Sequence, residues 1–317
     1  AAKSRATERE MNMRLLSSLN GLAAAGLGVL LSGTAVMAQA LEQVGAPVPA
    51  GTEHQPAGTG LARDMQWLDH TILVIITVIV VFVTALLLFV AFRFNATRNA
   101  KPATFTHNTA LEIAWTMIPI LILVFIGSFS LPELFRQQEI PQGDITIKVT
   151  GNQWYWSYEY VDDGVSFDSF LVDASYKIDD AAAGWGADQE MGPAQVMNDL
   201  TVKKLAYFGY KKEDFLLATD TAVVVPVGKT IVMQITGADV IHAWSVPAFG
   251  VMQSAVPGRL GQLWFNADRE GIYFGQCTTL CGKAHAYMPI TVKVVSQEAY
   301  DKWLAGAKDG KLQLASN

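Results

Sequence analysis

A short stretch near the C-terminal end concentrates the residues best suited to binding a metal. Cys277-Thr-Thr-Leu-Cys281-Gly-Lys-Ala-His285-Ala-Tyr-Met288 holds both cysteines of the protein, one of its five histidines and a methionine. Thiolates, imidazoles and thioethers are soft ligands, which suit copper better than calcium or magnesium. Two cysteines four positions apart can point both sulfurs inward and bridge a pair of metal ions. Each ion then needs an imidazole, so a second histidine is expected from elsewhere in the chain.

The second imidazole is expected from His242, within Ala238-Asp-Val-Ile-His-Ala-Trp244. A histidine at a strand edge is most often a surface residue, but the nearby Cys-x3-Cys-x3-His-x2-Met loop favours a ligand. Three other interpretations of the loop stay open: a disulfide, which so short a spacing would strain, a tetrahedral zinc site, and plain core packing for Met288. Copper gives every one of these side chains a role, in a closed centre that passes electrons without binding substrate.

The composition indicates a membrane-anchored protein with an acidic outer region. Hydrophobic residues make up 51% of the 317 residues, and the net charge is −6. Residues 144–220 contain 14 acidic and 6 basic residues, a net charge of −8. This asymmetry argues against a nucleic-acid partner and for a basic protein partner. Two cysteines are too few for a disulfide-based scaffold.

Residues 1–38 predict a leader with an export signal that is removed. The signal begins at Met11, continues with Arg14 and an apolar run over residues 15–37, and ends in Val36-Met-Ala38. Small residues at these last positions favour cleavage after Ala38, with Ala40 as the second choice. The alternative is an additional membrane helix. Residues 39–62, rich in Gly, Pro and Ala, are expected to form a flexible arm.

Two uncharged apolar runs predict a transmembrane hairpin over residues 63–136. Residues 71–92 and 113–131 are each long enough to cross a hydrocarbon core of about 30 Å as a helix. The link between them is basic, with Arg93, Arg98 and Lys101. Positive residues favour the cytoplasmic side, so both ends of the hairpin are expected in the periplasm.

Residues 140–296 predict an all-β domain outside the membrane, of the Greek-key sandwich or barrel type. Seven runs resemble strands, at residues 145–150, 154–160, 222–227, 230–236, 261–265, 271–275 and 290–295. Residues 171–215, with a helical stretch at 194–205, are interpreted as an insertion on the domain's surface. Residues 297–317 are expected to form a closing helix and a tail.

Four motifs together resemble the copper A-containing subunit II of cytochrome c oxidase, in its alphaproteobacterial form. They are the cysteine loop with its continuation Met288-Pro289, Gly151-Asn-Gln-Trp-Tyr-Trp-Ser-Tyr-Glu-Tyr160, Asp239-Val-Ile-His242 and Ala255-Val-Pro-Gly-Arg-Leu260. With the hairpin, the resemblance covers residues 66–303. It implies a cupredoxin fold, a location in the bacterial inner membrane, and assembly with the haem-bearing subunit I and with subunit III. The implied function is to accept electrons from cytochrome c at two copper ions and pass them to haem in subunit I, where oxygen is reduced and protons are pumped.

The resemblance also implies the ligand set of the copper pair. Both cysteines bridge, one ion is completed by His242 and Met288, and the other by His285 and the carbonyl of Thr279. The family usually has Cys-Ser-Glu-x-Cys here, and its glutamate carboxylate reaches a magnesium ion at the boundary with subunit I. A threonine hydroxyl is a poorer ligand for a hard cation. We therefore expect intact copper and a weakened or absent magnesium site.

Roles outside the loop follow from the same resemblance. Trp154 is implied as the electron entry point, with core packing as the alternative reading of the aromatic strand. Acidic residues are expected to dock the basic cytochrome, although scattered acids are usually only a solvated surface. They are Glu159, Asp162, Asp168, Asp220 and Asp239.

Glu112 has two compatible interpretations. It fits a capping box that begins at Thr109, and it matches a family glutamate at the mouth of the proton pathway called K. For the whole chain, the alternative is a membrane-tethered, non-redox binding module whose loop is stabilised by zinc or a disulfide.

Overall fold

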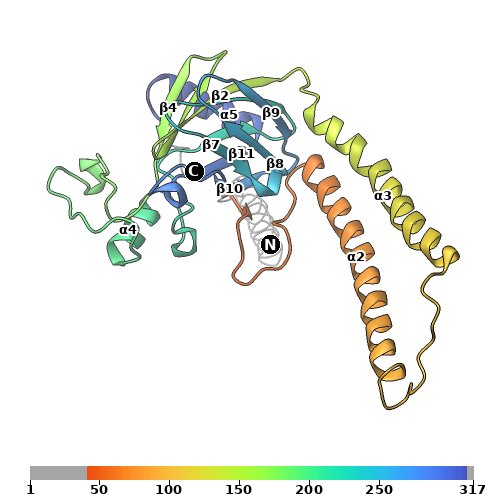
Figure 1. Ribbon diagram of the computed structural model, residues 1–317. Coiled ribbons are helices and arrows are strands. Elements are labelled where there is room, and N and C mark those ends of the chain that lie inside the picture. The colour runs from red at the N-terminus through yellow and green to blue at the C-terminus, as the bar shows by residue number, and fades with distance from the viewer. Residues whose placement is uncertain (1–40, 313–317) are drawn as a thin grey trace, which may run out of the picture. The chain divides into compact units, whose positions relative to one another are not determined.

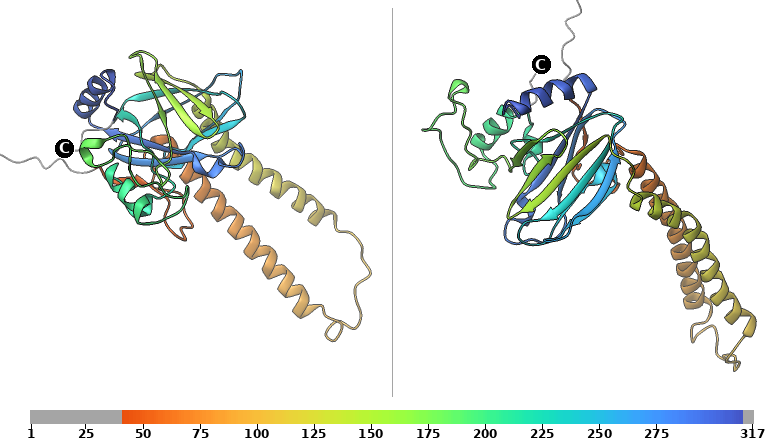
Figure 2. Two further views of the ribbon diagram at one scale, coloured as in Figure 1. Left: turned by 90° about the vertical axis from the view of Figure 1, so that its left-hand side faces the viewer. Right: turned by 90° about the horizontal axis from the view of Figure 1, so that it is seen from above.

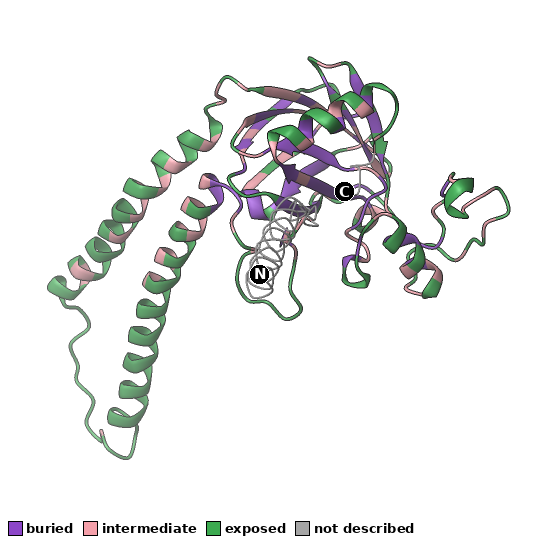
Figure 3. Cartoon of the chain, turned by 180° about the vertical axis from the view of Figure 1, so that it is seen from behind, coloured by how far each residue is buried: buried purple, intermediate pink, exposed green. Residues whose placement is uncertain are grey.

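The computed structural model describes residues 41–312, so the expected leader and the last residues of the tail lie outside the described part. Two long helices, α2 (Gly60–Arg93) and α3 (Thr109–Gln138), contain the predicted spans. Both are long and apolar enough to cross a membrane, and their surfaces are exposed over nearly their whole length (Figure 3). So large a continuous apolar surface marks a region that contacts a membrane or other proteins. The predicted hairpin is confirmed.

Each helix begins at a side-chain cap. The Thr59 Oγ1 accepts a hydrogen bond from the Ala62 N–H at 3.0 Å and donates one to the Phe249 carbonyl at 2.8 Å, which fixes the start of α2 against the β-domain. For α3 the cap is Asn108, whose Oδ1 accepts from the Leu111 N–H at 3.2 Å. The predicted capping box is thus displaced by one residue from Thr109, because asparagine is an even better N-cap than threonine.

The rest of the described chain forms two packed sheets (Figures 1 and 2). One has the strand order β5-β11-β10-β7-β8, with β1 paired to β10, and the other has the order β4-β3-β2-β6-β9. The strands are β1 (Gln43–Gly45), β2 (Ile145–Asn152), β3 (Tyr155–Tyr160), β4 (Val165–Ser169), β5 (Val223–Pro226), β6 (Thr230–Gly237), β7 (His242–Val246), β8 (Val251–Ala255), β9 (Gly261–Asn266), β10 (Gly271–Cys277) and β11 (Pro289–Val295). This is the all-β cupredoxin architecture that was predicted.

Large aromatic and aliphatic side chains from both sheets fill the space between them. Trp156 and Trp244 are fully buried, and Trp244 stacks with Phe265 at a centroid distance of 6.4 Å. Loss of such a side chain to alanine costs about 3–5 kcal/mol. The core therefore fixes the strand ends from which the metal-binding loops leave.

Four strands were not predicted from the sequence. β7 is buried at all five positions, so it shows no alternation of polar and apolar residues. β8 has only one fully buried position, whereas β4 alternates buried apolar and exposed polar residues and its signal was missed. β1 has three residues and is specified by its partner β10 more than by its own sequence.

The segment expected to be a flexible arm differs from that expectation where β1 forms. Gln43 pairs with Ile272 of β10, and Val44 is buried in the core. Gly45 allows this approach, since a Cβ there would lie 2.6 Å from the Tyr273 ring. A composition rich in Gly, Pro and Ala is compatible with close packing as well as with flexibility.

The insertion and the C-terminal helix pack on the sandwich. In the insertion, α4 (Asp199–Tyr207) starts later than the predicted 194–205 because Asn198 caps it at Thr201. A small apolar cluster of Val172, Leu205, Tyr210, Ala218, Ile272 and Phe274 joins the insertion to β10. The closing helix α5 (Gln297–Lys308) buries Tyr300 and Trp303. Short 3-10 turns lie at η1 (Ala181–Ala183), η2 (Lys212–Asp214), η3 (Pro247–Phe249) and η4 (His285–Tyr287).

Candidate metal centre

The candidate centre lies at one end of the first sheet, where two neighbouring strands bring distant residues together. His242 is the first residue of β7 and Cys277 is the last of β10, and these strands pair with Cys277 opposite Trp244. The pairing continues past the strand end, since the Thr278 N–H donates to the Ala243 carbonyl at 3.2 Å. The loop then runs to β11, which begins directly after Met288.

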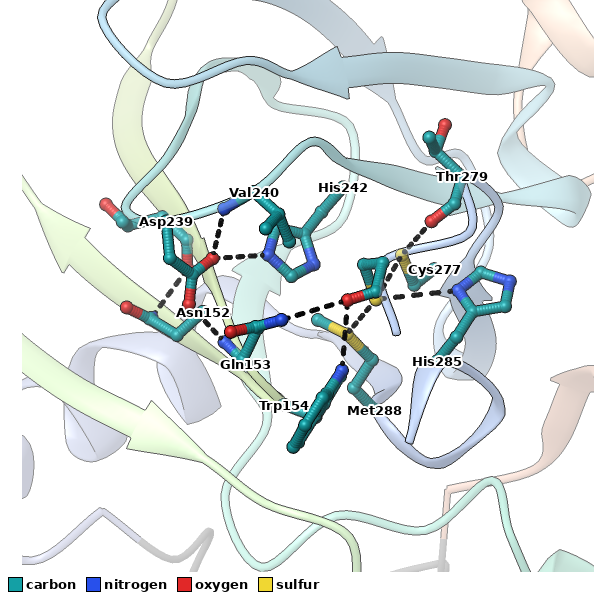
Figure 4. A network of polar contacts seen from close by, with 12 residues as sticks. Asn152, Gln153, Trp154, Asp239, Val240, His242, Cys277, Thr279, His285 and Met288 are labelled. Carbon is teal, nitrogen blue, oxygen red and sulfur yellow. Dashed lines mark hydrogen bonds and ion pairs between the residues drawn. The ribbon is translucent and has the colours of Figure 1, made fainter. Parts of the chain in front are cut away.

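All six residues predicted as metal ligands converge here (Figure 4). The Cys281 Sγ lies 3.9 Å from the Cys277 Sγ, 3.5 Å from the Met288 Sδ and 3.6 Å from the His285 Nδ1. On the other side, the carbonyl oxygen of Thr279 lies 3.3 Å from the Cys277 Sγ. The remaining donors therefore surround a core of two sulfurs.

His242 offers a lone pair to this core. Its side chain is fully buried, its Nε2 lies 2.9 Å from the Asp239 Oδ1, and its Nδ1 is buried without a hydrogen-bond partner. The carboxylate holds a proton on Nε2, which leaves Nδ1 free to bind a metal. Together with the two cysteine sulfurs, a His242 ring nitrogen falls in a cluster whose ligand atoms all lie within 4.8 Å of one another. A buried nitrogen without a partner is costly, so the site fits a bound ion.

The two thiols also have distinct acidities. Burial alone would raise the pKa of Cys277, but the neighbouring His242 ring and backbone groups lower it. Burial and the neighbouring Cys277 raise the pKa of Cys281. Cys277 is therefore the thiol that ionises more readily, and a metal ion would displace the proton of Cys281.

The geometry of the loop distinguishes a copper pair from the two alternatives, a disulfide and a single zinc ion. A disulfide has an S–S distance of about 2.05 Å, whereas both cysteines here are free, with sulfurs 3.9 Å apart. A single tetrahedral zinc ion would use two cysteines and two histidines. It would leave the Met288 sulfur and the Thr279 carbonyl without a role, although both point at the cysteines.

Trp154 lies beside the centre, but not on a strand as predicted. Asn152 pairs with Tyr155, so Gln153 and Trp154 form the turn between β2 and β3. The strand's later aromatics, Trp156 and Tyr158, are buried in the core, as the packing interpretation expected. Trp154 is half-buried instead, and its Nε1–H donates to the Cys281 carbonyl at 3.3 Å.

The five acidic residues expected to dock a partner have different environments. Glu159, Asp162 and Asp168 are exposed. Asp220 is only 8% exposed and accepts hydrogen bonds from the Phe170 N–H and the Tyr176 hydroxyl, so it is a structural carboxylate and not a surface one. Burial raises its pKa. This corrects its inclusion among docking residues.

Asp239 also serves the interior of the site. Its carboxylate accepts from the Gln153 N–H at 2.8 Å, from the Val240 N–H at 2.6 Å and from the His242 ring. Although burial acts in the opposite direction, the bond to His242 and these backbone bonds lower the pKa of Asp239. No role was predicted for Gln153, and Asp239 was not predicted to hold the His242 ring. The available signal was that Gln153 lies in the aromatic motif and that Asp239 lies close to His242 in the sequence.

Comparisons with known proteins identify the family of this chain. A family model described as the periplasmic domain of cytochrome c oxidase subunit II matches residues 145–191 and 195–295, and one for its transmembrane domain matches residues 47–132. Cytochrome c oxidase subunit 2 of Cereibacter sphaeroides is 55% identical over 306 residues, which are 96% of each chain. The chain belongs to the cytochrome c oxidase subunit II family.

Other members of the subunit II family match over shorter lengths. A probable cytochrome c oxidase subunit 2 of Rickettsia felis is 38% identical, covering 86% of this chain and 78% of the relative. The crystal structure of the periplasmic domain of subunit II (CoxB) of Bradyrhizobium japonicum has 40% identity, covers 54% of this chain and 99% of that one, and gives a TM-score of 0.40. As a subunit II, the chain is part of a cytochrome c oxidase, held in a membrane by its hairpin, with its β-domain in the periplasm.

Proposed function

We propose that this subunit holds a dinuclear copper A centre and is the point where electrons enter the oxidase. The observation that carries the proposal is the pair of cysteine sulfurs with two histidine ring nitrogens, a thioether and a carbonyl around them. Cys277 and Cys281 would bridge the ions, with the other four groups completing them. When bound, such a pair shares one electron over both ions. The residues of the chain keep the centre closed, since Cys277, Cys281 and Met288 are buried.

Metal analysis and electron paramagnetic resonance of the purified full-length chain test this proposal. We expect two copper ions per chain and a multi-line pattern from one electron coupled equally to two copper nuclei. One zinc ion per chain, or a disulfide that prevents copper uptake, would instead support the non-redox binding module. Replacing Cys281 by serine should leave no shared-electron signal, because a hydroxyl is a poor bridging ligand for copper.

We further propose that the electron donor is a basic cytochrome c that docks over Trp154. The indole contacts the metal loop directly through the Cys281 carbonyl, and three exposed acidic residues lie on β3, β4 and the turn between them: Glu159, Asp162 and Asp168. Complementary charge speeds association and makes it sensitive to salt. A steady-state KM for cytochrome c that does not change with ionic strength would contradict this docking mode.

The electron acceptor is then proposed to be haem in subunit I, with oxygen reduced and protons pumped there. The other proposed partners of the chain are subunit III and the lipid bilayer of the bacterial inner membrane. Both ends of the hairpin would lie in the periplasm, because its link carries the basic residues Arg93, Arg98 and Lys101.

Two finer roles extend this proposal. Glu112 lies in the first turn of α3, where its Oε1 accepts from the Asn108 N–H at 3.3 Å. Its second oxygen can serve a proton pathway at the cytoplasmic side. At the copper loop, Thr279 offers its carbonyl to the metal but no carboxylate to a magnesium ion, so we propose that the magnesium site is weak or absent.

A further inference from the structure

The β2–β3 turn is bonded to both loops that carry the proposed copper ligands. On one side, the Gly151 carbonyl accepts from the Ala238 N–H at 2.9 Å, and the Gln153 N–H donates to the Asp239 carboxylate at 2.8 Å. Asp239 in turn holds the His242 ring. The histidine-bearing loop is therefore bonded to the end of β2 through the Gly151 carbonyl and to the turn through the Gln153 N–H.

On the other side, the same turn is bonded to the cysteine loop. The Gln153 side-chain amide and the Trp154 indole both donate to the Cys281 carbonyl, at 3.2 and 3.3 Å. The Cys281 sulfur lies 3.5 Å from the Met288 sulfur and 3.6 Å from the His285 Nδ1. Close packing supports these bonds, because a Cβ at Gly282 would lie 3.0 Å from the indole. Figure 4 shows Gln153 between the two loops, with a bond to Asp239 on one side and a bond to the carbonyl that also accepts from Trp154 on the other.

We propose that Gln153 is a positioning residue, which fixes the distance between the His242 loop and the Cys281 loop and so sets the geometry of the copper pair. Its main-chain N–H serves one loop and its side chain serves the other. β7 and β10 already join the two loops at Cys277, but Cys281 lies beyond the strand end and has no such ladder bond. The turn supplies the missing restraint from the opposite sheet. This inference rests on the proposed copper function.

The chemistry of the bond decides which substitutions are informative. Gln153→Met keeps the length of the side chain and the main-chain N–H, and removes only the donor to the Cys281 carbonyl. Gln153→Glu keeps the shape even better, but places a carboxylate oxygen against that carbonyl. A role in packing alone predicts that glutamate is the milder change. A role through the hydrogen bond predicts that glutamate is the more severe one.

The test uses the full-length chain loaded with copper. We expect copper loss to a chelator to be about 10-fold faster in Gln153→Met, the lower end for loss of an outer-shell partner of a metal ligand, and faster still in Gln153→Glu. The copper hyperfine pattern and the reduction potential should shift in the same order. Asn152→Leu is the matched control, because the Asn152 amide donates to the Thr150 carbonyl and the Ser157 hydroxyl, away from both loops.

A double-mutant cycle separates bridging from two independent effects. If Gln153 links the loops, Gln153→Met should cost less copper retention once Asp239→Asn has loosened the histidine side. Additive effects, or a glutamate variant that retains copper like the unmodified chain, would overturn the inference. Failure of the unmodified chain to bind two copper ions would instead refute the proposed function, so the two failures are distinguishable.

Discussion

Replacement of Asp239 by asparagine distinguishes two roles that a surface acid beside a metal centre can have. As a docking residue, it would attract a basic donor. As a positioning residue, it would hold His242 for metal binding. The structure favours the second role, because the Asp239 carboxylate accepts three hydrogen bonds from the site itself and its side chain is 35% exposed.

The expected cost has two parts. The bond to the His242 ring changes from charge-assisted to neutral, a loss of about 1 kcal/mol. If the asparagine oxygen stays on the His242 ring and the Val240 N–H, the amide N–H2 must face the Gln153 N–H, which loses its acceptor. Water can reach this partly exposed group, so the lower end of the penalty for an unsatisfied donor applies, about 1 kcal/mol. Because the same bonds are present without the metal, about 2 kcal/mol is the upper limit of the loss in copper affinity, roughly 30-fold.

Copper affinity is measured by competition with a chelator, and KM for cytochrome c is measured over a range of ionic strengths. Asp162→Asn is the control, since it removes the same charge from an exposed position. We expect Asp239→Asn to lower copper affinity at every salt concentration, and Asp162→Asn to change only KM. If Asp239→Asn keeps its copper affinity within about threefold and raises KM in low salt alone, the positioning role is refuted.

Four further outcomes are expected. Asp168→Asn should raise KM for cytochrome c in low salt, whereas Asp220→Asn should leave KM unchanged because that carboxylate is buried; equal effects of the two would contradict the docking assignment. With manganese in place of magnesium, the oxidase should give no six-coordinate manganese signal, and Thr279→Glu should create one. Glu112→Gln should slow proton uptake while copper is reduced at the normal rate, and unchanged turnover would remove its proton role. Burial lowers the pKa of Lys293 from 10.5 to about 8, so the unfolded chain binds this proton more tightly and the free energy of unfolding should rise between those pH values. Lys293→Met should abolish that rise in denaturant titrations followed by tryptophan fluorescence, and should stabilise the chain at pH 7 by about 3 kcal/mol.

The architecture was largely predictable because its strongest signals are local. The two spans are continuous apolar runs, and the seven predicted strands are either alternating or strongly apolar segments. Two of the missed strands lack such a local signal. β7 shows no alternation of polar and apolar residues, and β1 forms by pairing with β10. A local pattern cannot indicate pairing with a strand more than 200 residues away in the sequence.

The candidate site was also predictable only in part. Metal-ligand chemistry is a property of residue types, so His242 and the cysteine loop could be assigned to one site from the sequence. The second layer, meaning the residues that hold the ligands in place, depends on geometry. That Asp220 is buried and that Asp239 faces a ligand cannot be deduced from their identity as acids, since an exposed and a buried aspartate have the same sequence signal.

This second layer changes how the electron-entry role of Trp154 has to be tested. Trp154→Phe removes the indole, but it also removes the hydrogen bond to the Cys281 carbonyl, so slower copper reduction would follow from either loss. Gln153→Met removes the other bond to the same carbonyl and leaves the indole in place. If Trp154 carries the electron, Trp154→Phe should slow reduction by cytochrome c far more than Gln153→Met, at equal copper content and with similar changes in the copper spectrum. Equal slowing in the two variants would mean that the turn acts by positioning Cys281, and not as the path of the electron.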